Sequence, residues 1–180
     1  HAVCFDPAEN QHIDGSLAYS IVPARLPQAL QQQAQTMAKR LADELNYVGV
    51  LAVEMFVAGD EQVLVVNEIA PRPHNSGHHT LDACVTDQFQ QQVRLMCGLV
   101  PGNTALLSPC TMANILGDVW GEDGSEPNWL NLQQQASSHL HLYGKKSARK
   151  GRKMGHFTTL SDSAEQALQA AQALHGSLKK

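Results

Sequence analysis

The amino-terminal part of the chain combines short apolar runs with one long amphipathic stretch. Residues 1–6 and 17–22 are apolar runs that predict strands, and the polar residues 9–15 between them predict a turn. Pro27 opens a predicted helix that extends to about residue 46, because apolar residues recur there at steps of three and four. These positions, which form one face of the helix, are Leu30, Ala34, Met37, Leu41 and Leu45.

A hairpin and a second helix are predicted next. Residues 47–57 are rich in β-branched and aromatic side chains, and residues 62–66 are apolar again, so that a turn at residues 58–61 would join two paired strands. Residues 87–97 predict a helix that Gly98 ends, since its apolar side chains follow steps of four and three.

The pattern changes after about residue 105. Strands are predicted at residues 112–116, 139–143 and 152–158, a short helix at 128–135, and a final helix from about 163, with Asp162 and Glu165 at capping-box spacing. The glutamine triplets at 31–33, 90–92 and 133–135 are interpreted as solvated helix faces. The whole pattern indicates an α+β fold in two unequal parts that meet near residue 105.

Composition and charge narrow the class of protein. The 180 residues are 43% hydrophobic and carry a net charge of −4, which argues against a general nucleic-acid binder. No stretch approaches the roughly 20 apolar residues that cross a bilayer. Because the chain begins at His1, without Met or a signal pattern, we expect an interior fragment or a proteolysed product. Four cysteines without CxxC spacing predict reduced, mostly buried thiols in a cytosolic protein.

Two carboxylates stand at matching positions of the predicted hairpin. Glu54 interrupts an apolar strand, and Glu68 closes the second strand, so a turn near Glu61 would place them opposite each other. A divalent cation between them would relieve their repulsion, and Mg²⁺ prefers one or two carboxylates plus phosphate oxygens. Alternatively, one carboxylate lies at a solvated edge and the other caps a turn. Asn67, a further oxygen ligand or phosphate partner, favours the metal.

Residues 67–79 hold the densest group of reactive side chains in the sequence. Pro71 and Pro73 restrict the backbone around Arg72, whose planar guanidinium matches a carboxylate, bicarbonate or phosphate. His74 can donate a hydrogen bond or move a proton near neutral pH. Additional neutral donors are Asn75 and Ser76, and Gly77 lets the backbone approach a ligand. His79 is interpreted as structural, and a zinc site of His74, His78 and His79 is disfavoured by the two prolines.

A basic run occupies residues 145–153 and holds six of the 13 Lys and Arg residues. Such a run is usually a solvated loop or a general polyanion patch. Here it lies between two predicted strands and contains Gly151, so that backbone N–H groups can face an anion. The absence of interleaved aromatic residues argues against single-stranded nucleic acid. A phosphate site in a hairpin loop is therefore our preferred interpretation.

The strings NEIAPRPHNSGHHT at residues 67–80 and YGKKSARKGRKMGH at residues 143–156 resemble one family closely. The chain is similar to carboxyaminoimidazole ribonucleotide synthetase, the ATPase subunit of phosphoribosylaminoimidazole carboxylase, in the ATP-grasp superfamily. The resemblance implies the later part of an ATP-grasp domain at residues 1–104, an antiparallel sheet with flanking helices, followed by a small carboxy-terminal α/β domain at residues 105–180. Family members are about twice as long, so we expect the fragment alone to be inactive.

The resemblance also implies a reaction and its partners. ATP, bicarbonate and aminoimidazole ribonucleotide would give ADP, phosphate and the N-carboxylated ribonucleotide through carboxyphosphate, in cytoplasmic purine biosynthesis. The full-length protein would be a homodimer that binds no nucleic acid or membrane. Carried over by motif, the site residues would be Glu54 and Glu68 for Mg²⁺; His12, Asn67 and Glu68 for ATP; Arg72, His74, Asn75 and Ser76 for bicarbonate and carboxyphosphate; and Lys145, Arg149, Arg152 and Lys153 for the ribonucleotide phosphate.

One departure and three rivals accompany this resemblance. Lys150 stands where the family usually has proline, which puts the geometry of the basic loop in doubt. A formate-dependent glycinamide ribonucleotide transformylase shares the Pro-Arg-Pro-His string, but its relatives typically continue with Asp-Thr-Gly. A non-catalytic fragment for anion binding or dimerisation is a rival from another class. A nucleic-acid module is motivated only by the basic run.

Overall fold

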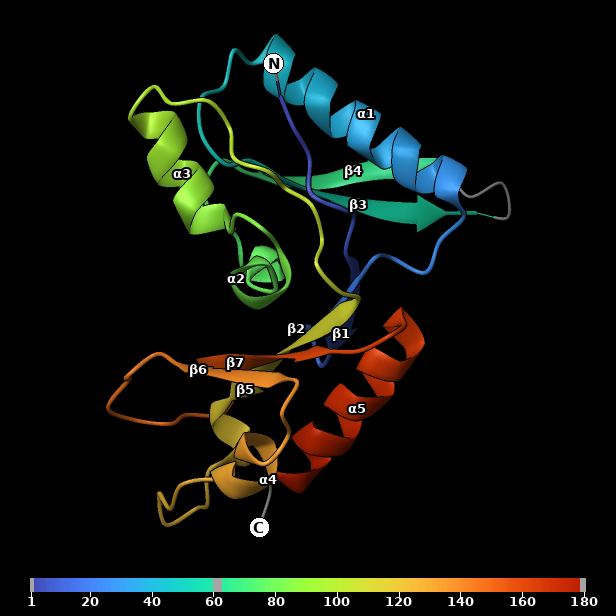
Figure 1. Ribbon diagram of the computed structural model, residues 1–180. Helices are drawn as coiled ribbons and strands as arrows, with labels where there is room; N and C mark the ends of the chain where they lie inside the picture. The colour runs from blue at the N-terminus through green and yellow to red at the C-terminus, as the bar shows by residue number, and fades with distance from the viewer. Residues whose placement is uncertain (1, 60–62, 179–180) are drawn as a thin grey trace. The chain divides into compact units, whose positions relative to one another are not determined.

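The computed structural model describes residues 2–59 and 63–178, and the chain divides into two compact units (Figure 1). Unit 1 comprises His1–Ala8 and Pro23–Leu107, and unit 2 comprises Glu9–Val22 and Ser108–Lys180. The chain passes from unit 1 to unit 2 for the last time between Leu107 and Ser108, close to the expected boundary at residue 105. The early segment Glu9–Val22 also belongs to unit 2. Within the described residues, no helix is long and apolar enough to cross a membrane.

Unit 2 is built on a five-stranded antiparallel sheet. Its strand order is β1-β2-β5-β7-β6, with β1 at Glu9–Ile13, β2 at Ser16–Val22, β5 at Cys110–Leu116, β6 at Ser138–Leu142 and β7 at Lys153–Leu160. Helix α5, Ala164–Ser177, packs on the sheet (Figure 1), and the short α4, Trp129–Gln133, contacts β6 and α5. The core between sheet and helix consists of fully buried apolar side chains, among them Ile21, Ile115, Phe157, Ala171 and Leu178.

Unit 1 combines a two-stranded hairpin with helices. Strand β3, Ala52–Ala58, pairs antiparallel with β4, Val63–Ala70, as the sequence predicted. Helix α1, Gln28–Glu44, and helix α3, Gln88–Met96, confirm the two predicted amphipathic helices. Between hairpin and α3 lie a short 3-10 turn, η1 at Asn75–Gly77, and one turn of helix, α2 at Thr80–Ala83. The turn expected at residues 58–61 falls partly outside the described residues.

The prediction for the first fifteen residues was wrong in part. Residues 2–6 form no strand, and the expected turn at residues 9–15 contains β1. The turn itself is only Asp14-Gly15, because Ile13 pairs with Ser16 and both central residues have positive φ, of 50° and 74°. An Asp-Gly pair of this kind favours a tight hairpin, which the polar sequence of β1 concealed.

Two local predictions on the helices also need correction. Ser163, not Asp162, is the N-cap of α5, and its Oγ accepts a hydrogen bond from the Gln166 backbone N–H. The glutamine triplets are not uniformly solvated, since Gln91 is 3% exposed. Gln31 likewise uses its side-chain amide to donate to the carbonyls of Ala24 and Leu26. At these positions a glutamine side-chain amide takes the place of a backbone hydrogen-bond partner. The residue type alone does not reveal which glutamines do this.

Candidate active site

Two carboxylates face each other across the β3–β4 hairpin. Glu54 and Glu68 are paired directly in the antiparallel register, as the sequence predicted. The Glu54 side chain keeps 22% of its surface exposed, and Glu68 is exposed. Like charges at directly opposed positions repel each other unless a cation lies between them. The pair therefore offers oxygen ligands for a divalent cation at the surface of the hairpin.

Asn67 is the additional residue of a β-bulge beside this pair. Glu54 pairs with Glu68, but the next residue, Met55, pairs with Val66, so β4 holds one residue more than β3 at this point. Bulges bend a strand and re-aim its side chains, and they are common next to active sites. The sequence predicted the hairpin but not the bulge, which lies inside the ladder and places Asn67 next to the Glu54–Glu68 pair.

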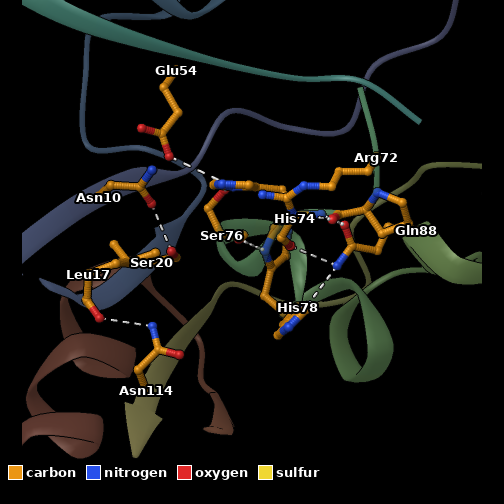
Figure 2. A network of polar contacts seen from close by, with 12 residues as sticks. Asn10, Leu17, Ser20, Glu54, Arg72, His74, Ser76, His78, Gln88 and Asn114 are labelled. Carbon is orange, nitrogen blue, oxygen red and sulfur yellow. Dashed lines mark hydrogen bonds and ion pairs between the residues drawn. The ribbon is translucent and has the colours of Figure 1, made fainter. Parts of the chain in front are cut away.

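The loop after β4 brings a histidine to the first carboxylate (Figure 2). His74 Nδ1 lies 3.7 Å from Glu54 Oε1 and 2.9 Å from Ser76 Oγ. The His74 side chain is only 14% exposed, and its backbone is extended. Carboxylate, imidazole and hydroxyl thus converge within unit 1, although they come from β3 and from the loop that follows β4.

Arg72 is exposed at the start of the same loop. Its Nη1 donates to the Pro73 carbonyl at 3.1 Å, which holds the guanidinium beside its own loop. The remaining N–H groups of the fork can meet a carboxylate, bicarbonate or phosphate in a bidentate arrangement. Asn75 opens the 3-10 turn, and its carbonyl accepts from the His78 N–H at 3.1 Å.

His79 is structural, as expected. It is 3% exposed, and its Nδ1–H donates to the Ser76 carbonyl at 2.9 Å. Burial lowers the pKa of His79 from 6.5 to about 4, although the hydrogen bond to Ser76 opposes part of that effect. The imidazole is therefore neutral at physiological pH, and its buried hydrogen bond to Ser76 stabilises the turn.

The lowered pKa of His79 makes the stability of the protein depend on pH. Between pH 6.5 and 4 the unfolded chain binds a proton at this residue that the folded protein does not, so the free energy of unfolding falls as the pH falls through this window. We expect a loss of up to about 3 kcal/mol at pH 4 relative to pH 7. Urea unfolding at several pH values measures it. The dependence of the free energy of unfolding on pH should become weaker in His79→Gln. It should persist in His139→Gln, because His139 is exposed.

The positions of the three histidines disfavour the zinc interpretation. His79 Nδ1 is engaged by the Ser76 carbonyl, and His78 Nδ1 lies 2.8 Å from Gln88 Nε2. His74 Nδ1 lies beside Ser76 Oγ. Each ring also has an Nε2 that could bind a metal, but within the described residues the three histidines do not bring one ligand atom each within 4.8 Å of one another, as a shared zinc ion would require.

The basic run forms a hairpin loop of unit 2, as predicted, since it joins β6 to β7. Arg152 Nη1 donates to the Ser147 carbonyl at 2.9 Å and to Ser147 Oγ at 3.0 Å. The Gly151 N–H donates to Asp118 Oδ2 at 2.7 Å, which anchors the loop tip. Lys145 Nζ donates to the Lys153 carbonyl. These contacts order the loop despite Lys150, which is exposed.

The expected site residues are divided between the units. Unit 1 brings together Glu54, Asn67, Glu68 and the segment 72–76, whereas the four basic residues lie in unit 2. His12 also belongs to unit 2, where it is exposed on β1 next to a register irregularity. Each unit thus contains one group of the residues that the sequence predicted to bind anions, on its own loops and strand ends.

Gln88 is a residue of this region that sequence reasoning missed. It is 2% exposed, and its side-chain amide contacts both His74 and His78 (Figure 2). The one available signal was its place directly after Asp87, which caps α3 by accepting from the N–H groups of Phe89 and Gln90. A glutamine in the first turn of a helix is common, so the sequence alone did not distinguish it.

Comparisons with known proteins agree with this arrangement. The model of the ATP-grasp domain matches residues 1–89, and that of the phosphoribosylaminoimidazole carboxylase C-terminal domain matches residues 110–170. The N5-carboxyaminoimidazole ribonucleotide synthase of Bacillus subtilis strain 168 is 49% identical over 165 residues, which cover 92% of this chain and 42% of that protein. The chain belongs to the N5-carboxyaminoimidazole ribonucleotide synthase family.

Solved structures of the synthase family show the same fold. The synthetase from Thermus thermophilus superposes with a TM-score of 0.85 at 38% identity, over 98% of this chain and 46% of that one. The synthase from Aspergillus clavatus, solved with ADP and 5-aminoimidazole ribonucleotide, gives 0.84 at 29% identity, over 95% and 46% of the two chains. The fold class expected from the sequence is confirmed, and the chain spans less than half the length of these family members.

Proposed function

We propose that the protein containing this chain carboxylates 5-aminoimidazole ribonucleotide to the N5-carboxy ribonucleotide, in an ATP- and bicarbonate-dependent step of cytoplasmic purine biosynthesis. The observation that carries the proposal is the direct opposition of Glu54 and Glu68 with His74 Nδ1 3.7 Å from Glu54. In this proposal the two carboxylates bind the cation and His74 donates a proton or hydrogen bond beside them. Residues 1–104 would be the later part of the ATP-grasp domain, and residues 105–180 the small carboxy-terminal domain.

In this proposal Glu54 and Glu68 hold Mg²⁺, and Asn67, Glu68 and His12 bind ATP. The donor set fits the metal, because two carboxylates that share one register position provide hard oxygen ligands. When bound, Mg²⁺ neutralises charge on the phosphates. Asn67 is suited to a phosphate oxygen because the bulge turns it out of the regular ladder.

Arg72, His74, Asn75 and Ser76 would bind bicarbonate and shield carboxyphosphate. The exposed guanidinium of Arg72 orients the planar anion through two parallel hydrogen bonds. His74, beside Glu54 and Ser76, donates to an oxygen of the anion, and Asn75 and Ser76 add neutral donors. Phosphoryl transfer to bicarbonate depends on positioning and charge stabilisation, so these groups need form no covalent bond.

Lys145, Arg149, Arg152 and Lys153 would bind the phosphate of the ribonucleotide. We expect Arg152→Ala to raise the KM for the ribonucleotide about tenfold, because a charge-assisted hydrogen bond is worth about 1.5–3 kcal/mol. The KM for ATP should stay unchanged. Lys150→Ala is the control in the same loop, at an exposed position outside the proposed set. If both variants raise the KM for the ribonucleotide equally in steady-state kinetics, the loop contributes only non-specific positive charge, and the specific role proposed for Arg152 is wrong.

The decisive experiment measures ADP release by a full-length family protein that carries this chain. With ATP and 5-aminoimidazole ribonucleotide present, release should depend on bicarbonate, and the N-carboxylated ribonucleotide should form in proportion. Activation by formate with glycinamide ribonucleotide, without bicarbonate, would overturn the proposal in favour of a transformylase. We also expect the full-length protein to be a homodimer.

The 180 residues alone should bind ATP weakly and turn nothing over. They cover only 42% of the Bacillus subtilis relative, and the proposed ATP ligands come from one hairpin and one strand. Robust ATPase activity of the isolated chain would contradict this expectation.

A further inference from the structure

We propose that Gln88 is a positioning residue for the loop of residues 72–79. Its side-chain amide fixes the backbone of His74 and sets the tautomer of His78. The inference deepens the proposed function, on which it rests, since it explains how the bicarbonate-binding loop keeps its shape. It concerns contacts within unit 1 alone.

Three hydrogen bonds join the Gln88 amide to the loop. Gln88 Oε1 accepts from the His74 backbone N–H at 2.8 Å, and Nε2 donates to the His74 carbonyl at 2.9 Å. Nε2 also lies 2.8 Å from His78 Nδ1 (Figure 2). Because Gln88 is 2% exposed, water cannot replace these bonds without opening the structure. One amide thus clamps both backbone groups of His74 as a strand partner would.

The backbone of His74 decides which way the amide points. Its N–H can only donate and its carbonyl can only accept, so the oxygen of Gln88 must face the former and the nitrogen the latter. The second hydrogen of Nε2 then points to His78 Nδ1, which must accept it. His78 is therefore held as the neutral tautomer with its proton on Nε2.

Neighbouring residues hold Gln88 in place. Its backbone N–H donates to Thr80 Oγ1 at 3.0 Å, and Thr80 Oγ1 donates to the Gly77 carbonyl at 2.7 Å. A Cβ on Gly77 would lie 2.7 Å from Gln88 Oε1, closer than side chains tolerate. Gly77 thus makes room for the Gln88 amide, and the close approach to a ligand that the sequence suggested stays a prediction.

Gln91, one turn further along α3, supplies a matched control. It is 3% exposed and clamps Gly102 in the same way, accepting from its N–H and donating to its carbonyl, both at 2.9 Å. Replacing either glutamine by methionine keeps the side-chain volume and removes a two-bond backbone clamp, and in the case of Gln88 also the bond to His78. The two variants should therefore lose similar stability, but only one of them touches the proposed bicarbonate loop.

In the full-length protein we expect Gln88→Met to lower kcat/KM for bicarbonate about 30- to 100-fold, since small misplacements of binding groups cost this much. The KM for ATP should stay unchanged, and more ADP should be released per carboxylated product. Gln91→Met should leave these parameters unchanged while lowering the melting temperature by a similar amount. If the unaltered protein is active and both variants change these kinetic parameters equally, the inference is wrong.

A second measurement does not depend on enzymatic activity. The ¹⁵N chemical shifts of the His78 ring report which nitrogen carries the proton, and we expect Nδ1 to be unprotonated at neutral pH. In Gln88→Glu the donor becomes an acceptor, so Nδ1 should gain a proton. A protonated Nδ1 in the unaltered protein would refute the clamp. If the His78 ring shifts are as expected but turnover does not depend on bicarbonate, the clamp is supported and the proposed function is wrong.

Discussion

Glu68→Gln in the full-length protein is expected to lower magnesium-dependent turnover by roughly 10²- to 10³-fold, equivalent to several kcal/mol of transition-state stabilisation. The carboxylate lies directly opposite Glu54, so its loss leaves one charged ligand where two shared the register position. The amide keeps the size and one oxygen of the side chain but not its charge. The apparent affinity for Mg²⁺ should fall together with kcat.

Metal titrations of steady-state activity measure this effect. Glu54→Gln should act similarly, and the double variant should lose much less than the product of the two single losses, because both residues would bind one ion. Glu44→Gln, at an exposed position of α1 where the carboxylate pairs with Arg40, is the control and should leave turnover unchanged. Unchanged kinetics of Glu68→Gln would remove Glu68 from the site.

The second large effect is expected for Arg72→Lys, which keeps the charge but not the planar fork. We expect kcat/KM for bicarbonate to fall about 100-fold, because an ammonium cannot form the bidentate pair that orients a planar anion. The melting temperature should be unaffected, because the guanidinium is exposed and donates to the Pro73 carbonyl of its own loop.

Arg40→Lys is the matched control for charge and exposure, since Arg40 is exposed and pairs with Glu44 on the next turn of its own helix. Initial rates at varied bicarbonate and saturating ATP separate the two variants. Wild-type bicarbonate dependence of Arg72→Lys would show that charge alone suffices at this position. The planar recognition that we assign to Arg72 would then be wrong.

The sequence predicted those features that depend on local periodicity. The amphipathic spacing of α1 and α3 and the apolar strands of the β3–β4 hairpin were found because each pattern is continuous in the chain. The opposition of Glu54 and Glu68 was predicted by assuming a turn centred near Glu61. In the structure it depends on the bulge, because Met55 pairs with Val66 and a regular ladder would place Glu54 opposite Asn67. The bulge at Asn67 could not be counted in advance, since nothing in the residue types distinguishes it from a regular position.

Features that depend on distant partners escaped prediction. The polar strand β1 forms because β2 and the Asp14-Gly15 turn pair it, not because its own residues favour a strand. Gln88 and Gln91 have the same residue type as the exposed Gln90 between them, and only their buried backbone partners make them different. Polar clamps of this kind are specified by geometry, which sequence periodicity does not encode.

The chain passes between the two units three times, at residues 8/9, 22/23 and 107/108. Strand β2 lies inside the sheet of unit 2, between β1 and β5, although it precedes most of unit 1 in the sequence. Residues 108–180 produced alone would therefore expose the backbone groups of β5 that β2 covers, an open edge that invites aggregation. Unit 2 therefore cannot be exchanged between proteins as one continuous segment, because its sheet also needs Glu9–Val22 from the amino-terminal part of the chain.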